Sequence, residues 1–177
     1  MGGFGGQGII LAGAIVGQAA AIFDQKNATF TQEYGPEARG GACQAQVVIS
    51  DSPIAYPYAE SPSVLVAMSP EAYAKLIPSI GPEALLLIDE DLVKPEDPAP
   101  RNLLAIPATR FAEELGRKAV ANIVMLGFVA SVSSIVSTKA MRQAVLASVP
   151  KGTEELNTKA FECGHAYGQR LLSARQS

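Results

Sequence analysis

The chain opens with a glycine-rich run whose spacing suits anion binding. The stretch Gly3-Phe4-Gly5-Gly6-Gln7-Gly8 fits the G-x-G-x-x-G pattern, and an apolar segment of helical length follows it. Glycines at this spacing allow a tight turn, which brings backbone N–H groups against a phosphate or carboxylate at a helix N-terminus. A tight strand-to-helix turn without any ligand explains the same pattern. Four residues are therefore candidate contacts to an anion, to coenzyme or to a partner: Gly5, Gly6, Gln7 and Gly8.

The same run also allows a dinucleotide-binding interpretation. Dinucleotide-binding proteins place a strand before the glycines and, about 20 positions on, an acidic residue that binds the ribose. Asp24 has the right separation, but it precedes the next expected strand instead of ending it. A stand-alone nucleotide-binding module remains the alternative function. It predicts tight binding of NAD or another nucleotide to the isolated chain.

A second glycine-rich segment contains an acid and a base. The stretch Tyr34-Gly35-Pro36-Glu37-Ala38-Arg39-Gly40-Gly41 is expected to be a loop because of its glycines and its proline. Arg39 can bind a carboxylate or a phosphate through two parallel hydrogen bonds. Gly40 and Gly41 allow a ligand or another chain to approach the backbone closely. A clamp on a carbonyl or carboxylate of the same fold explains Arg39 equally well.

Few other polar residues indicate chemistry. Asn122 lies in an apolar segment and costs stability unless its amide is bonded, so it either holds the glycine loop, reaches an interface or is a satisfied core amide. His165 is the one histidine, and nothing around it indicates catalysis. Cys43 and Cys163 are far apart in the sequence and form no C-x-x-C, which argues against metal or iron–sulfur ligation by this chain. Acids that close a strand, such as Asp89, are expected to be solvated.

Composition narrows the class of protein. The 177 residues are 48% hydrophobic and 18% charged, with a formal net charge of −3. Because soluble domains are usually about 25% charged, the low share indicates either a surface covered by partners or a well-packed domain. Lys and Arg are scattered, so no nucleic-acid footprint is expected. The apolar stretches 8–23 and 119–136 are short or interrupted, which indicates buried helices and a cytoplasmic protein without a membrane span.

Hydrophobic patterning predicts a layered α/β architecture. Strands alternate with helices in the first part, and helices fill the second. Gly13 and Gly17 would share one face of the first helix, where we expect tight packing on the sheet. We predict one domain over 1–177, a three-layer α/β/α fold with a mostly parallel or mixed central sheet and a helical C-terminal half. The expected strands are 27–33, 42–50, 63–68, 84–88 and 103–106. The expected helices are 9–23, 70–76 capped by Ser69, 109–115, 119–136, a segment to about 149 capped by Thr138, and 154–172 capped by Thr153.

These motifs together resemble those of the gamma subunit of 2-oxoacid:ferredoxin oxidoreductases. The resemblance is carried by the glycine run at 3–8, the loop at 34–41, Val47-Val48-Ile49-Ser50 and Ala121-Asn122-Ile123-Val124-Met125-Leu126-Gly127. It spans the whole chain and favours the 2-oxoglutarate or branched-chain 2-oxoacid type, with 2-oxoglutarate slightly ahead.

The resemblance implies a division of labour between chains. The holoenzyme of this family oxidatively decarboxylates a 2-oxoacid to an acyl-CoA and reduces ferredoxin. Thiamine diphosphate, Mg and iron–sulfur clusters are held by alpha, beta and, in some members, ferredoxin-like delta subunits. The gamma chain is then an assembly and closing component that contacts CoA or a partner, holds no cofactor firmly, contributes no catalytic residue and is inactive alone. Isolated, it can self-associate. The expected interface residues are Tyr34, Pro36, Glu37 and Asn122.

The resemblance also implies a strand before the glycine run. Only two residues precede Gly3, so we expect that strand to be missing or the start to be truncated. A strand missing from inside a sheet would leave backbone ladder groups unpaired. We further expect the two glycine loops to meet at one end of the sheet.

Overall fold

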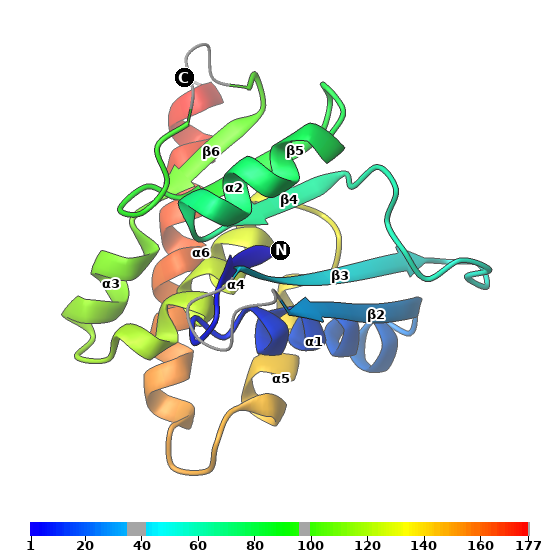
Figure 1. Cartoon of the computed structure of the whole chain (residues 1–177). Helices are drawn as coiled ribbons and strands as arrows, with labels where there is room; N and C mark the ends of the chain where they lie inside the picture. The colour runs from blue at the N-terminus through cyan, green and yellow to red at the C-terminus, as the bar shows by residue number, and fades with distance from the viewer. Residues whose placement is uncertain (35–41, 96–99, 177) are drawn as a thin grey trace.

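A mixed six-stranded sheet forms the centre of the molecule. The computed structural model describes residues 1–34, 42–95 and 100–176, and its strand order is β2-β3-β1-β4-β5-β6. β1, β4, β5 and β6 run parallel, whereas β3 is antiparallel to both β1 and β2 (Figure 1). This agrees with the predicted mixed sheet. The strands are β1 (Gly2–Phe4), β2 (Asn27–Tyr34), β3 (Ala42–Ser50), β4 (Val64–Ala67), β5 (Leu85–Asp89) and β6 (Leu103–Ile106).

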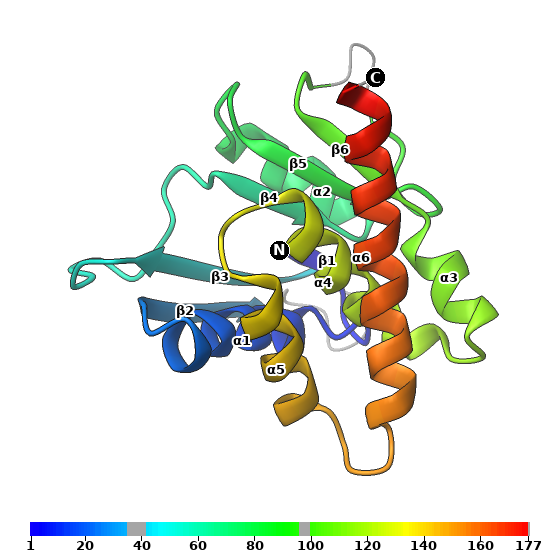
Figure 2. The ribbon, with the colours of Figure 1, turned by 180° about the vertical axis from the view of Figure 1, so that it is seen from behind.

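Helices cover both faces of this sheet. Gly2 and Gly3 are adjacent in β1 and therefore point to opposite faces: a Cβ on Gly2 would meet α2, and a Cβ on Gly3 would meet Ile9 of α1. The predicted three layers are confirmed, with α2 on one face and α1, α4 and α6 on the other (Figures 1 and 2). The helices are α1 (Ile9–Gln18), which continues as a π-helical turn (Ala19–Phe23), α2 (Pro70–Leu76), α3 (Ala108–Glu114), α4 (Ala121–Val132), α5 (Thr138–Ser148) and α6 (Glu154–Gln176), with 3-10 turns at Ile77–Ser79 and Lys118–Val120.

The helix boundaries agree with the prediction only in part, and α6 runs to Gln176 instead of ending near 172. Ser69 caps α2 as expected, since its side chain accepts a hydrogen bond from the N–H of Ala72. For α5, the cap is Ser137 and not Thr138, because the Ser137 side chain accepts from the N–H of Ala140. The long apolar helix ends at Val132, since Ser133 has an extended backbone with φ −128° and ψ 156°.

The close approach of α1 to the sheet depends on a small residue. A Cβ added to Gly13 would lie 2.5 Å from Ala45 Cβ and 3.0 Å from the Phe30 ring. Both neighbours belong to the β2–β3 hairpin. The predicted tight packing of this helix on the sheet is therefore confirmed.

A three-residue strand, β1, leads into the glycine turn, so the alternative that this strand is missing altogether is wrong. β1 is only three residues long, yet it lies in the middle of the sheet. Gly2 is paired with Gln44 of β3 on one side and with Ala67 of β4 on the other. β1 is thus paired along both of its edges.

The helical second half is organised around α4. Every residue from 121 to 130 is buried, and no helix among the described residues is long and apolar enough to cross a membrane. α4 packs closely against α6, where a Cβ on Gly127 would collide with the carbonyl oxygen of Phe161. This contact fixes the position of α4 and so of Asn122 at its start.

Candidate functional site

The glycine turn lies where the direction of the fold reverses. β1 and β4 are parallel neighbours, so their carboxyl ends share one edge of the sheet. The chain leaves β1 for α1 on one face and leaves β4 for α2 on the other face. In open α/β sheets, ligands bind in the crevice at such a switch point. The sequence motif therefore stands at the position where the topology favours a site.

Gln7 bridges this crevice with its side-chain amide. Its Oε1 accepts a hydrogen bond from the N–H of Phe4 at 2.6 Å, and its Nε2 donates to the carbonyl of Met68 at 2.8 Å. Met68 directly follows β4. Both ends of the amide are thus bonded within the fold, and Gln7 holds the turn against β4. A ligand contact by Gln7 stays a prediction.

The glycine turn leads directly into the N-terminus of α1, which no side chain caps. Gly6 and Gly8 have φ of 96° and 72°, the left-handed region that glycine adopts without strain. Gly8 is the N-cap of α1, where no side chain bonds the first turn. Gly5 and Gly6 are exposed. The partial positive charge of these free N–H groups favours an anion at this end of the helix.

Asn122 holds the glycine turn from the other side. Its Nδ2 donates to the carbonyl of Gly8 at 3.1 Å. The residue is only 3% exposed, and its Oδ1 has no hydrogen-bond partner among the described residues. Of the alternatives left open by the sequence, contact with the glycine loop is confirmed.

A small cavity lies beside the turn. Its volume is about 160 Å³, and Gly6, Gly8 and Asn122 line it together with Arg117 and Asn157. Arg117 is exposed. The lining thus includes an arginine and the N-cap glycine of α1, alongside apolar side chains such as Leu11 and Ile123. An arginine beside a helix N-terminus suits an anionic group.

The residues that flank the second glycine-rich segment, Tyr34 and Ala42, lie at the same edge of the sheet as the glycine turn. Phe4, which starts the glycine turn, is paired with Ala42, and Tyr34 is paired with Cys43. Tyr34 is 68% exposed. The ends of both loops therefore lie at one edge of the sheet, as predicted. The intervening candidates lie outside the described residues: Pro36, Glu37, Arg39, Gly40 and Gly41.

Asp24 has a different role from the one a dinucleotide site would require. Its two carboxylate oxygens accept hydrogen bonds from Ser137, from the backbone N–H at 2.6 Å and from Oγ at 2.7 Å. Asp24 thereby joins the end of the first helical segment to the start of α5. These bonds leave the carboxylate engaged within the fold, which counts against a ribose-binding role.

Asp89 is buried, although the sequence led us to expect a solvated acid at this position. It is fully buried at the end of β5, and its Oδ2 accepts from the N–H and from Oγ1 of Thr109 at 3.1 and 2.6 Å. Burial raises the pKa of this carboxyl, while the bonds from Thr109 and Asp91 oppose the rise. The prediction of a solvated acid was wrong because Asp89 binds the first turn of α3. The threonine at that helix start was the available signal.

The sheet order and the switch-point turn define a three-layer α/β protein with a candidate site at the carboxyl ends of β1 and β4. Residues 1–167 match the family described as "Pyruvate ferredoxin/flavodoxin oxidoreductase". The chain belongs to this family, as a subunit of the gamma type.

The similar proteins within this family include subunits of enzymes named for 2-oxoglutarate and for ketoisovalerate. The chain is 51% identical over 173 residues to the 2-oxoglutarate synthase subunit KorC of Methanocaldococcus jannaschii, over 96% of this chain and 92% of that protein. It is 33% identical to the ketoisovalerate oxidoreductase subunit VorA of Methanothermobacter thermautotrophicus, over 71% of this chain and 26% of that protein. The keto/oxoacid ferredoxin oxidoreductase gamma subunit of Geobacter sulfurreducens superposes with a TM-score of 0.83 and 40% identity, over 96% of both chains.

The described residues contain no group of three or more His, Cys, Asp or Glu side chains that could hold a metal ion. Cys43 and Cys163 are both free thiols, and burial raises the pKa of each.

Proposed function

We propose that the chain is the gamma subunit of a 2-oxoglutarate:ferredoxin oxidoreductase. The reaction is the oxidative decarboxylation of the 2-oxoacid to its acyl-CoA, with electrons passed to ferredoxin. The observation that carries this is the 51% identity to a 2-oxoglutarate synthase subunit over 96% of this chain. The match to a ketoisovalerate enzyme is weaker at 33% identity and shorter on both chains, so it supports a branched-chain substrate less.

Within this enzyme, we assign the chain a role in assembly and in closing the site over CoA. Thiamine diphosphate, Mg and the iron–sulfur clusters would belong to alpha, beta and, where present, delta subunits. The uncapped N-terminus of α1 and the cavity lined by Arg117 and Asn122 support contact with an anionic group. A phosphate of CoA or a carboxylate of a partner subunit has that chemistry. Arg39 is the further cation that we assign to this contact.

Co-expression tests the proposal. The tagged chain, produced with the candidate alpha and beta subunits, should recover both partners and a brown iron–sulfur absorption. The complex should reduce a viologen dye only with CoA and should prefer 2-oxoglutarate to branched-chain 2-oxoacids. A colourless chain without partners, which instead binds NAD tightly in calorimetry, would overturn the proposal in favour of a nucleotide-binding module.

Arg39→Ala tests the proposed anion contact. The variant should raise the KM for CoA or weaken recovery of the partner subunits, by about tenfold if one charge-assisted hydrogen bond is lost. The matched control is Arg101→Ala. Arg101 is exposed and precedes β6, at the edge of the sheet opposite the glycine turn. Equal values for both variants and the parent complex would remove Arg39 from the assignment.

A further inference from the structure

The two outer strands of the sheet are protected to different degrees. β6 closes one side with four residues, and Arg175 of α6 donates to the carbonyl of Leu103 at 3.1 Å. β2 closes the other side with eight residues, and no described strand pairs with its outer edge (Figure 1). Long unpaired edges are templates for pairing with a further strand. β2 is therefore the edge of this sheet that is open to another chain.

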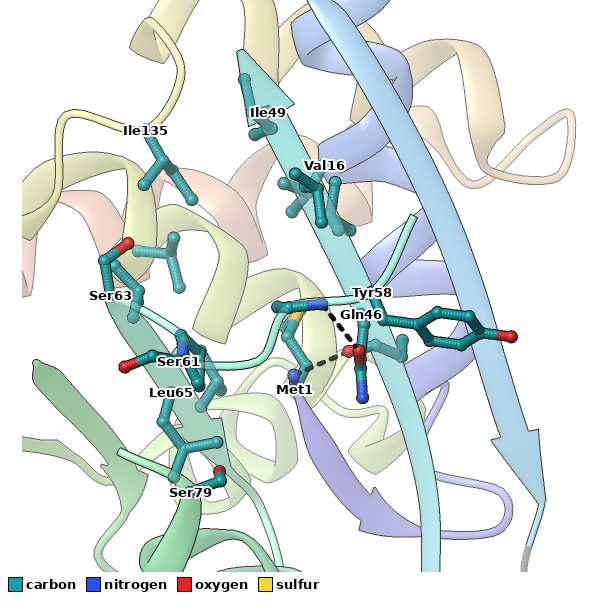
Figure 3. Close-up of a pocket in the computed structure, with 18 of the residues that line it drawn as sticks. Met1, Val16, Gln46, Ile49, Tyr58, Ser61, Ser63, Leu65, Ser79 and Ile135 are labelled. Atoms are coloured by element: carbon teal, nitrogen blue, oxygen red, sulfur yellow. Dashed lines mark hydrogen bonds between the residues drawn. The ribbon is translucent and has the colours of Figure 1, made fainter. Parts of the chain in front are cut away.

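Alternate residues of β2 direct their backbone groups outward. The Met1 amino group donates to the Ala45 carbonyl at 2.8 Å (Figure 3), and the Ala45 N–H donates to the Met1 carbonyl at 2.9 Å, so the backbone of Ala45 faces β1. Because neighbours in an antiparallel strand alternate, the backbone of Gln46 faces β2, where it is paired with Thr31. The same alternation turns the N–H and C=O groups of four β2 residues away from β3: Ala28, Phe30, Gln32 and Tyr34. No hydrogen bond joins these outward groups to another described residue.

The sequence of β2 contains none of the usual barriers to a further strand. Its pairing with β3 is continuous from Asn27 to Tyr34, so no bulge bends the edge. It contains no proline, and the Oε2 of its one charged side chain, Glu33, lies 3.7 Å from Nζ of Lys75 on α2. Natural edges are commonly blocked by prolines, bulges or inward-pointing charges. The edge of β2 is thus free to pair.

The segment that follows β3 lies over a face of the sheet and not beside this edge. Ala45 faces α1, so the side chain of Gln46 points to the opposite face. There its Oε1 accepts a hydrogen bond from the N–H of Ala59 at 3.2 Å (Figure 3). On the same face, Thr29 Oγ1 donates to the Pro57 carbonyl at 3.3 Å. These bonds hold the segment over the α2 face of the hairpin and leave the outer edge of β2 open.

The position of α1 indicates what kind of chain fits beside β2. A Cβ on Gly13 would lie 2.5 Å from Ala45 Cβ and 3.0 Å from the Phe30 ring, so α1 lies over the gap between β3 and β2. A second copy paired through its own β2 would place its α1 over the corresponding gap, two strand spacings or about 10 Å away. Packed helices have axes about 8–10 Å apart. The sheet and its helical layer would both continue, whereas a lone strand would leave the flank of α1 without a neighbour.

One register pairs every outward-facing residue of two copies. It is antiparallel and centred on Thr31, which faces Thr31 of the second copy. The outward residues then pair as follows: Ala28 with Tyr34, and Phe30 with Gln32. Glu33 faces Thr29, so like charges do not meet across the edge. The two Phe30 side chains, each 37% exposed in the single chain, lie diagonal to one another, within the reach of aromatic rings.

We propose that β2 binds β2 of a second copy of this chain, in this register, so that two six-stranded sheets join into one continuous sheet. Because the strands are antiparallel, Tyr34 at the glycine edge lies beside Ala28 of the second copy. The two glycine turns therefore lie at opposite ends of the joined strands, and each remains open to other subunits. The pairing does not depend on the reaction assigned to the enzyme.

An engineered disulfide tests the register. Directly opposed residues that share no hydrogen bonds have Cα atoms about 4.5 Å apart, which suits a disulfide. Thr31→Cys should therefore form a covalent dimer of the full chain under mild oxidation. Thr29→Cys is the matched control on the same strand and face. Its two cysteines would lie about 14 Å apart, so it should cross-link at least about tenfold more slowly. Both variants carry Cys163→Ser, because Cys163 is partly exposed whereas Cys43 is buried.

A proline on the outward side tests the pairing without a cross-link. Gln32→Pro removes an N–H that faces away from β3 and puts the ring against the second copy, a position where an edge strand tolerates proline. Gln32→Val is the matched control. Sedimentation at about 20 μM should give the parent chain and Gln32→Val about twice the chain mass of 18.5 kDa, and Gln32→Pro the mass of one chain.

Three results would overturn the strand pairing. These are a parent chain that stays monomeric at about 100 μM, equal masses for Gln32→Pro and Gln32→Val, and equal cross-linking of Thr31→Cys and Thr29→Cys. A cooperative thermal transition of Gln32→Pro shows that this variant is folded. Should that transition be lost, the pair of cysteine variants decides alone.

Discussion

Two side-chain amides set the geometry of the glycine turn at the scale of single residues. Gln7 bonds Phe4 and Met68, and Asn122 bonds the carbonyl of Gly8. The glycines supply the left-handed backbone, but the turn is held to β4 and α4 by these amides. The motif in the sequence therefore needs partners that lie 61 and 114 positions away.

Replacing Gln7 should destabilise the fold. Gln7→Ala removes both bonds and leaves the Phe4 N–H and the Met68 carbonyl half-buried without them, so the free energy of unfolding should fall by about 1–3 kcal/mol. Urea denaturation measures this. Gln143→Ala is the matched control, because Gln143 is exposed on α5, and it should change stability by less than about 0.5 kcal/mol. Equal effects would mean that the Gln7 bonds contribute nothing.

The buried amino group of Met1 predicts a pH dependence of stability. Desolvation lowers its pKa from 8.0 to about 6 in the folded chain. The folded state therefore releases this proton while the unfolded state keeps it, so stability should rise between about pH 6 and pH 8. A pKa lowered by about two units corresponds to a change of about 2–3 kcal/mol in the free energy of unfolding across this pH range.

N-terminal acetylation provides the comparison for this pH effect. It removes the titrating group and leaves every other side chain in place. Urea midpoints of the free and acetylated chains should diverge as the pH falls from 8 to 6, with the free chain losing more stability. Parallel pH profiles would show that the Met1 amino group is solvated.

At the scale of elements, glycines set the distance between α4 and α6. A Cβ on Gly164 would collide with the carbonyl oxygen of Val124, and a Cβ on Gly127 would collide with that of Phe161. Both collisions involve backbone, which cannot turn away as a flexible side chain would. Since α4 positions Asn122, this helix pair also supports the glycine turn.

Gly164→Ala should therefore destabilise the chain despite the better helix propensity of alanine. Overpacking typically costs about 1–3 kcal/mol, and the propensity gain of about 1 kcal/mol offsets only part of it. Thermal unfolding should show a lower Tm. Gly81→Ala is the control, because the nearest atom to its added Cβ is 4.0 Å away. A Gly164→Ala variant as stable as the Gly81→Ala variant would show that the helices can separate at little cost.

The elements also show what sequence reasoning can and cannot predict. Strands β2 to β6, the helix order and the Ser69 cap follow from local patterning, and these five strands lie within one or two residues of their predicted bounds. The short β1 was not predicted. The roles of Asp24 and Asp89 depend on Ser137 and Thr109, which lie 113 and 20 positions away. Local patterns do not show which distant residue a carboxylate binds, even where a helix-start threonine such as Thr109 offers a signal.

At the scale of the whole molecule, the two ends of the sheet differ. The edge at Phe4 gathers the glycine turn and the ends of the second loop, and it exposes Tyr34. The other edge carries the end of β3 and the segment with Tyr56 and Tyr58, whose rings lie 5.5 Å apart. The low charged share of 18% is in keeping with a chain that other subunits cover in part.

If the glycine edge is the subunit interface, Tyr34 should anchor it. Exposed aromatic side chains are enriched among the residues that dominate binding energy. Tyr34→Ala should weaken association with the partner subunits about tenfold or more, a loss of at least about 1.4 kcal/mol, and leave the Tm of the isolated chain within about 2 °C.

Tyr56→Ala is the matched control for this interface. Tyr56 is 57% exposed against 68% for Tyr34, and it follows β3 at the opposite edge. Both variants would be compared by the partner concentration needed for half-maximal dye reduction. If Tyr34→Ala raises this concentration more than Tyr56→Ala does, the interface lies at the glycine edge. A larger loss with Tyr56→Ala would place the partners at the opposite edge.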